Sequence, residues 1–103
     1  MEYRIIKSPS KGTLDILFRR KGSAATIPIA NYDAVGLIQG RLIDMVFAAD
    51  IAEKAAGVVV EDIKGHCPQN LIMIAIFGDT ASVEAAMKEI QYKCKEQKTG
   101  ETL

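Results

Sequence analysis

The pattern of apolar residues predicts three short strands. An apolar run at 34–39 predicts a short buried strand, the β-branched Val58-Val59-Val60 begins a strand that runs to Lys64, and a continuous apolar run at 71–77 predicts the third. Only a turn rich in Gly, Pro and Asn, at 65–70, separates the second strand from the third. We therefore expect these two strands to pair with each other.

The N-terminal part of the chain shows an alternating pattern. A short strand is predicted at 3–7, and turn residues follow it at 8–12. From 13 to 19, the apolar Leu14, Ile16 and Phe18 alternate with other residues, with Leu17 as an exception on the polar side. A period of two is typical of a half-buried strand, so the segment 3–19 is predicted to resemble a hairpin.

Two segments have helical character. Residues 42–56 are apolar or alanine around most of a helical circumference, which predicts a helix covered on most sides. Gly57 suits the position just after its end. A second helix is predicted from 81 to about 94, with Asp79 or Thr80 as its N-cap. Its apolar stripe consists of Val83, Met87, Ile90 and Cys94.

The order of these elements predicts an α+β fold, an α/β sandwich in which helices flank a mostly antiparallel sheet. The chain of 103 residues has room for one core. We expect a single domain at 1–94, in which 1–32 comprises the N-terminal strands and an irregular connector. Residues 33–94 form the core strand-helix-strand-strand-helix unit, and 95–103 is a polar tail.

The charge balance excludes one class of partner. Thirteen basic and thirteen acidic residues sum to zero, so the chain has no bulk field to hold nucleic acid or an anionic membrane. No apolar run has the length of a membrane-spanning helix, and the N-terminus lacks the pattern of a signal peptide. We expect neither nucleic acid nor membrane as a partner.

The sequence contains none of the common catalytic motifs. It lacks a phosphate-binding glycine loop, Gly-x-Ser-x-Gly, a paired-histidine metal motif and Cys-x-x-Cys. Cys94 lies on the apolar stripe of the last helix and is predicted to be a buried structural thiol. We expect that the protein is not an enzyme.

One turn contains residues that suit metal binding. It consists of Gly65, His66, Cys67, Pro68, Gln69 and Asn70. Proline stiffens the turn beside the thiol, and His66 suits a role as second ligand or as a group that lowers the thiol pKa. One Cys and one His cannot fill a site of about four ligands. The turn is therefore either an ordinary connection or part of a site that rotational symmetry completes.

The stretch 33–90 resembles the shell domain of bacterial microcompartments. The matching pieces are the strand at 34–38, the alanine-rich helix with Ala48-Ala49-Asp50 and Lys54-Ala55-Ala56, the strand end Ile76-Phe77-Gly78-Asp79, and the helix start at 81–86. This resemblance implies a structural protein of the bacterial cytoplasm. It also implies cyclic homo-hexamers that tile with other shell proteins into a layer, with the 65–70 loop lining a central pore.

Other residues narrow the resemblance to a circularly permuted subclass. Arg4-Ile5-Ile6 and Thr13-Leu14 resemble its opening, and the chain ends soon after the second core helix. In permuted relatives the segment 3–7 lies near the axis and caps the pore as a small barrel. Gly65-x-Cys67-Pro68-Gln69 is similar to an iron–sulfur-binding motif. This similarity implies a cluster at Cys67 shared between subunits, and enclosed enzymes of the glycyl-radical type.

The resemblance also assigns residues at the hexamer edge. Lys54 matches the family lysine that contacts the next hexamer, although an exposed helix lysine by itself indicates only solvation. Ordinary members carry an edge arginine after the final strand, and only Arg19 or Arg20 is available for that role here.

Two other functions remain open at this point. The first is an oligomeric small-molecule-binding regulatory module with a similar α+β sandwich. The second is a redox enzyme that uses Cys67 as nucleophile, although His66 is its only nearby base and no second cysteine is at hand.

Overall fold

A computed structural model of the chain describes residues 1–20, 32–55, 57–65 and 71–97. Its elements follow in the order β1 (Glu2–Lys7), α1 (Lys11–Arg20), β2 (Ala34–Arg41), α2 (Leu42–Lys54), β3 (Val58–Ile63), β4 (Leu71–Gly78) and α3 (Thr80–Glu96). The strands form one sheet in the order β1-β2-β4-β3, and every neighbouring pair is antiparallel. The predicted fold class and the pairing of β3 with β4 are confirmed.

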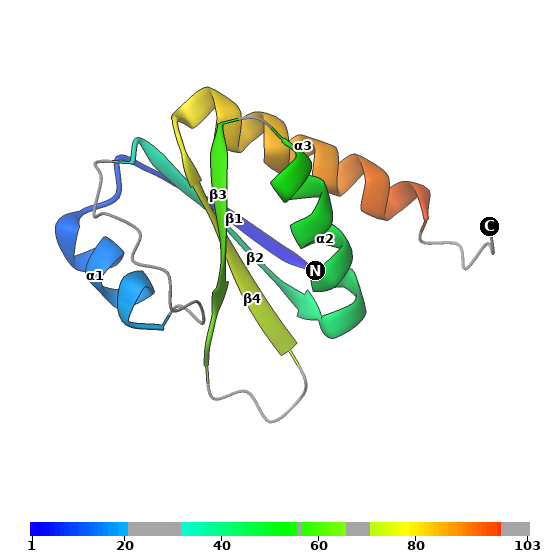
Figure 1. The fold of residues 1–103 in the computed structure, drawn as a ribbon, viewed down its shortest axis with the longest axis horizontal. Coiled ribbons are helices and arrows are strands. Elements are labelled where there is room, and N and C mark those ends of the chain that lie inside the picture. The colour runs from blue at the N-terminus through cyan, green and yellow to red at the C-terminus, as the bar shows by residue number, and fades with distance from the viewer. Residues whose placement is uncertain (21–31, 56, 66–70, 98–103) are drawn as a thin grey trace.

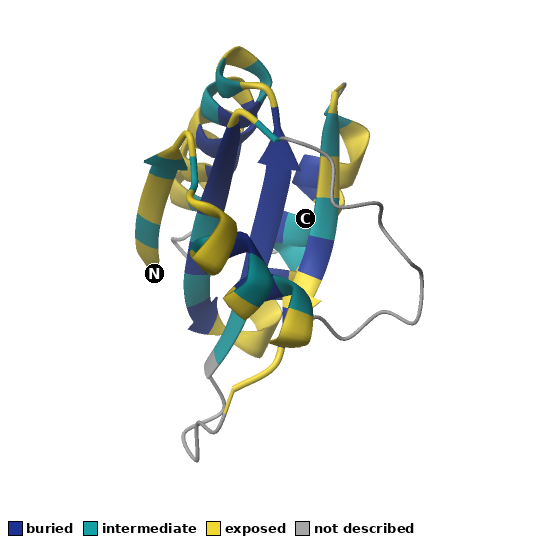
Figure 2. Cartoon of the chain, turned by 90° about the vertical axis from the view of Figure 1, so that its left-hand side faces the viewer, coloured by how far each residue is buried: buried dark blue, intermediate teal, exposed yellow. Residues whose placement is uncertain are grey.

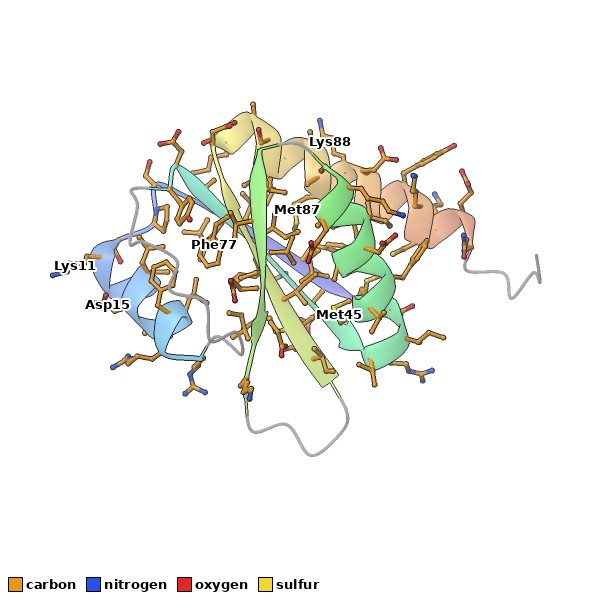
Figure 3. The ribbon with its side chains drawn as sticks, viewed as in Figure 1. Lys11, Asp15, Met45, Phe77, Met87 and Lys88 are labelled. Atoms are coloured by element: carbon orange, nitrogen blue, oxygen red, sulfur yellow. The ribbon has the colours of Figure 1, made fainter. Side chains whose placement is uncertain are left out.

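Helices cover both faces of the sheet (Figure 1). α2 and α3 pack on one face over a large apolar cluster that includes Ile38, Met45 and Met87. α1 packs on the other face over a smaller cluster that includes Leu17, Ile63 and Phe77. The side chains in Figure 3 separate in the same way, since Phe77 lies on the α1 side and Met45 and Met87 lie toward α2 and α3.

The two central strands are the most deeply buried elements. β2 and β4 have helices on both faces and a strand on each side, so their residues have little contact with water (Figure 2). This explains why their sequences are continuous apolar runs rather than alternating ones. The edge strand β1 is mostly exposed.

Residues 11–20 form a helix, and the predicted strand at 13–19 is wrong. The buried residues of α1 are Leu14 and Leu17, with Phe18 half-buried, so the spacing is three and four. Ile16, which the alternating pattern placed on the buried face, is 50% exposed. The Ser10 hydroxyl accepts the Thr13 N–H at 3.2 Å and caps the first turn. Leu17 was thus a helical signal rather than an exception.

Because 11–20 is a helix, the expected pairing partner of β1 changes as well. β1 does not form a hairpin with 13–19, because it pairs with β2 along its whole length, from Glu2 with Gln39 to Lys7 with Ala34. It belongs to the main sheet, so the expectation that 3–7 forms a separate small barrel is wrong.

The remaining helix ends agree closely with the sequence analysis. Gly57 follows α2 with a φ of 82°, the left-handed conformation that glycine adopts at low cost. α3 continues to Glu96, two residues past the predicted end, and the rest of the tail at 98–103 lies outside the described residues, as does the connector at 21–31. Among the described residues, no helix is long and apolar enough to cross a membrane.

The N-cap of α3 is Asp79, which is one of the two residues that the sequence predicts for this position. Its Oδ1 accepts the Ser82 N–H at 2.8 Å, and its Oδ2 accepts the Ser82 hydroxyl at 2.9 Å. The backbone hydrogen bond from Ser82, followed by the hydroxyl hydrogen bond, lowers the pKa of Asp79 below its usual 3.8. A lowered pKa in the folded state means that the charged cap stabilises the fold above that usual pKa, and that this contribution is lost as the pH falls through the folded value.

We expect Asp79→Ala to lower the melting temperature by a few degrees at neutral pH, because α3 loses its cap. The difference from the unmodified chain should shrink as the pH falls below the usual carboxyl pKa of 3.8 and through the lowered pKa of Asp79. Circular dichroism melts at several pH values measure both effects. Equal melting temperatures at neutral pH would show that this cap contributes nothing.

Candidate functional site

The predicted metal-binding turn joins two neighbouring strands at one end of the sheet. β3 ends at Ile63, the exposed Lys64 and Gly65 follow it, and β4 begins at Leu71. Gly65 has no atom within 4 Å of the position that a Cβ would occupy. The other predicted site residues, His66, Cys67, Pro68, Gln69 and Asn70, lie outside the described residues.

α1 holds the first end of this loop. The Lys64 N–H donates to the Arg20 carbonyl oxygen at 2.6 Å, and Arg20 Nη1 donates to the Lys64 carbonyl oxygen at 3.5 Å. Ile63, just before Lys64, is 3% exposed and belongs to the same apolar cluster as Leu17. The strand end beside the loop is therefore packed and hydrogen-bonded to α1.

The start of α2 lies beside the second end of the loop. Leu71, the first residue of β4, pairs with Arg41, and α2 begins at the next residue, Leu42. Figure 1 shows α2 starting at the end of the sheet where β4 begins. The two described ends of the loop thus lie beside the C-terminal end of α1 and the N-terminal end of α2, which pack on opposite faces of the sheet.

The first half of α2 carries large aliphatic side chains that nothing in the described chain covers. Leu42 is 54% exposed, Ile43 is 76% exposed and Val46 is 62% exposed, and their spacing places them on one face of the helix. We call these three residues the aliphatic face of α2. Sequence analysis predicted a helix covered on most sides, and within one chain this face is uncovered. Such a patch is typical of an interaction surface.

Lys54 lies at the opposite end of α2. It is separated from Leu42 by 12 residues, or about 18 Å along the helix axis. Its ammonium group pairs with Asp50 at 2.8 Å, and its side chain is 75% exposed. Arg20 lies at the loop end instead, against Lys64, so the structure does not bring it near Lys54 as a second edge residue.

An open groove lies between α2 and α3, with Ala81 and Ala85 among its lining residues. The lysines beside it are already paired, Lys54 with Asp50 and Lys93 with Glu89 at 3.4 Å. Both lysines of the groove are therefore engaged in ion pairs with carboxylates of their own helices.

The described part of the chain gives little basis for acid–base or metal chemistry. Among residues 1–20, 32–55, 57–65 and 71–97, no three His, Cys, Asp or Glu side chains gather closely enough to hold a metal ion. Glu61 is the buried charged residue of this part, and its Oε1 has no hydrogen-bond partner. Burial, and secondly the negative charge of Glu61, raise the pKa of Tyr32.

Cys94 has the packing role predicted for it, with one difference. It packs against the larger apolar cluster from the last turns of α3, but it is half-buried rather than fully buried. Burial first, then Cys94 and Asp44, raise the pKa of Tyr3. The two cysteines of the chain thus have different settings, one on a helix against the core and one in the loop.

Comparison with known protein families matches residues 34–103 to the BMC domain. This match spans β2 to the end of the chain, including both elements that flank the loop. The chain belongs to the BMC domain family. Residues 1–33, which hold β1 and α1, lie outside the matched region.

Two solved structures resemble this BMC-domain chain over nearly all of its length. One is a ligand-free structure of the GrpU microcompartment shell protein from Clostridiales bacterium 1_7_47FAA, with 59% identity, 93% of each chain covered and a TM-score of 0.74. The other is a ligand-free structure of the GrpU shell protein from Pectobacterium wasabiae, with 41% identity, a TM-score of 0.70 and coverage of 87% of this chain and 99% of that one. A comparison with curated proteins gives no match.

Sequence reasoning located the loop but missed two features beside it. The contact between Arg20 and Lys64 was missed because 13–19 was taken for a strand. The spacing of Leu14, Leu17 and Phe18 was the signal that could have revealed α1. The sequence of α2 shows that this helix has few polar residues. Which of its apolar residues are exposed depends on which side of the helix packs on the sheet.

Proposed function

We propose that this BMC-domain chain is a structural shell protein of a bacterial microcompartment in the bacterial cytoplasm, where it closes into a cyclic hexamer. The family membership and the likeness to two GrpU shell proteins over nearly the whole chain support this role. The observation that carries the proposal is the aliphatic face of α2, Leu42, Ile43 and Val46, which is exposed beside the loop end.

When a different surface of the next copy covers this face, the contact between the two copies is head-to-tail. Such a head-to-tail contact closes into a ring when the rotation between copies allows it. Because the aliphatic face lies at the loop end of the molecule, contacts made there bring the loops of successive copies toward one axis. The Gly65–Asn70 loop would then line a central pore that passes small metabolites.

The opposite end of α2 would lie at the rim of that ring. Lys54 is exposed there, about 18 Å from Leu42 along α2. We assign Lys54 to the contact between neighbouring hexamers and other shell proteins, through which the layer extends around the enclosed enzymes. The resemblance of the loop motif indicates that these enzymes are of the glycyl-radical type.

We propose further that the loops hold an iron–sulfur cluster through Cys67. One chain offers Cys67 and His66 in the loop, and its described residues add no group of three ligating side chains. A cluster of about four ligands therefore needs thiols from several copies, which a ring supplies. Six thiols exceed what one cluster binds, so we expect incomplete ligation or fractional occupancy. When bound, such a cluster supplies one-electron transfer.

The placement of β1 supports assignment to the circularly permuted subclass. β1 precedes the matched region in sequence, yet it pairs with β2 and completes one edge of the sheet. A strand that ordinary members carry after the core would occupy such a position if it had moved to the front of the chain.

The hexamer proposal predicts that Ile43→Glu lowers the mass measured by light scattering from a hexamer toward a monomer. An ionised carboxylate buried in an apolar contact without a partner is strongly unfavourable. Ile16→Glu is the matched control, because Ile16 is also an exposed isoleucine on a helix surface but lies on α1. A hexamer that persists in Ile43→Glu contradicts the assignment, and a dimer of the unmodified chain favours a regulatory module.

Lys54→Ala is expected to leave the hexamer and its melting temperature unchanged but to abolish extended sheets in electron micrographs. An exposed ion pair contributes only about 0–1 kcal/mol to folding, so a loss of sheets would report the contact between hexamers. Lys93→Ala is the control, since Lys93 forms an equivalent exposed pair with Glu89 on α3. Loss of sheets in both variants, or in neither, would argue against a specific edge role for Lys54.

Anaerobic reconstitution with iron and sulfide should give a broad visible absorption that Cys67→Ser abolishes and Cys94→Ser retains. The physical reason is that Cys94 packs against the core, whereas Cys67 lies in the loop. Iron content measured on the same samples checks the assignment. If Cys67→Ser keeps the chromophore while Cys94→Ser loses it, the cluster does not lie at the loop.

A further inference from the structure

α1 meets the rest of the chain at the point where β3 ends and the loop begins. The Lys64 N–H donates to the Arg20 carbonyl oxygen at 2.6 Å, and the Arg20 guanidinium donates back to the Lys64 carbonyl oxygen at 3.5 Å. The two residues are 44 positions apart in sequence. This contact is therefore tertiary, and nothing in the local sequence of either residue requires it.

The two backbone groups in this contact lie at positions where a hydrogen-bond partner within the same helix or sheet is usually missing. Arg20 is the last residue of α1, and the final carbonyls of a helix have no intrahelical donor. Lys64 follows the last residue of β3, which is an edge strand in the sheet formed by the described residues. The helix end and the strand edge satisfy each other, which fixes α1 against the stem of the loop.

Apolar packing supports the same contact. Leu14 and Leu17 of α1 are 6% and 5% exposed, and they share a cluster with Ile63, which is 3% exposed. The next residue after Lys64 is Gly65, which has open space around it and the widest backbone freedom of any residue type. Lys64 is thus the last residue before the loop that the rest of the fold constrains directly.

We propose that α1 is a positioning element for the loop, and that the Arg20–Lys64 contact sets the direction in which the chain leaves β3 toward the ring axis. This inference rests on the proposed ring, where the direction decides whether the Cys67 thiols of neighbouring copies meet. It gives a role to a helix that lies outside the region matched to the BMC domain.

The test uses the full chain with Cys94→Ser, so that Cys67 is the sole remaining cysteine of the two. A short bismaleimide then joins subunits only where two Cys67 thiols lie close together, and denaturing gels measure the yield. Lys64→Pro removes the amide donor, while the extended Ile63 before it is compatible with a following proline. Lys64→Ala keeps the amide and removes only the side chain.

We expect Lys64→Pro to keep the hexamer mass and to lose cross-linking severalfold, while Lys64→Ala stays close to the parent. Equal cross-linking in Lys64→Pro and Lys64→Ala hexamers would overturn the inference. If Lys64→Pro does not assemble, Arg20→Ala is compared with Arg19→Ala. We expect a smaller loss of cross-linking in Arg20→Ala alone, and equal yields would again overturn the inference.

Amide hydrogen exchange separates failure of this inference from failure of the proposed function. A parent chain that neither forms hexamers nor cross-links would refute the ring. The Lys64 amide should nevertheless exchange slowly in that chain, because its hydrogen bond to Arg20 lies within one subunit. Exchange of this amide as fast as in an unprotected peptide would refute the contact itself, whatever the oligomeric state.

Discussion

The pairing of β2 with β4 is the constraint on which the rest of the structure depends. The two strands match over eight residue pairs, from Ala34 with Gly78 to Arg41 with Leu71, and helices bury both of their faces. This register places the ends of the other elements. At one end of the pair Gly78 leads into the cap of α3, and at the other end Arg41 and Leu71 bring the start of α2 beside the loop. The proposed site thus lies where the most deeply buried strand pair ends.

The described part of the chain leaves an apolar surface uncovered, and this surface lies at the end of the sheet where the proposed site is. α2 buries Met45, Ala48 and Ala52 against the sheet but exposes the aliphatic face formed by Leu42, Ile43 and Val46. In the proposed ring another copy covers that face, and the same contact brings the loops of neighbouring copies together. In this arrangement the apolar contact that drives assembly and the loop that would act at the axis depend on one short helix.

α1 shows how a local pattern can support two structures. Leu14, Ile16 and Phe18 fit a strand, while Leu14, Leu17 and Phe18 fit a helix. Whether the segment forms a strand or a helix depends on whether a strand is available to pair with it and on which apolar surface of the sheet it covers. β2 already has β1 and β4 as neighbours, so 13–19 has no strand partner there, and Phe77 needs apolar cover on that face. As a helix, the segment places Phe18 on Phe77, with ring centroids 5.4 Å apart.

The sequence by itself determined the fold class and the β3–β4 pair, and it narrowed the cap of α3 to Asp79 or Thr80, because these features show in residues that are close together in the chain. Apolar runs, turn residues and a helix cap act over a few positions, so their patterns can be recognised directly. The partner of β1, the helical state of 11–20 and the contact of Arg20 with Lys64 were decided only by the tertiary structure. Each of these features depends on groups that are more than 20 positions apart in the chain. Whether such groups meet depends on which helices cover the faces of the sheet and which strands occupy its edges.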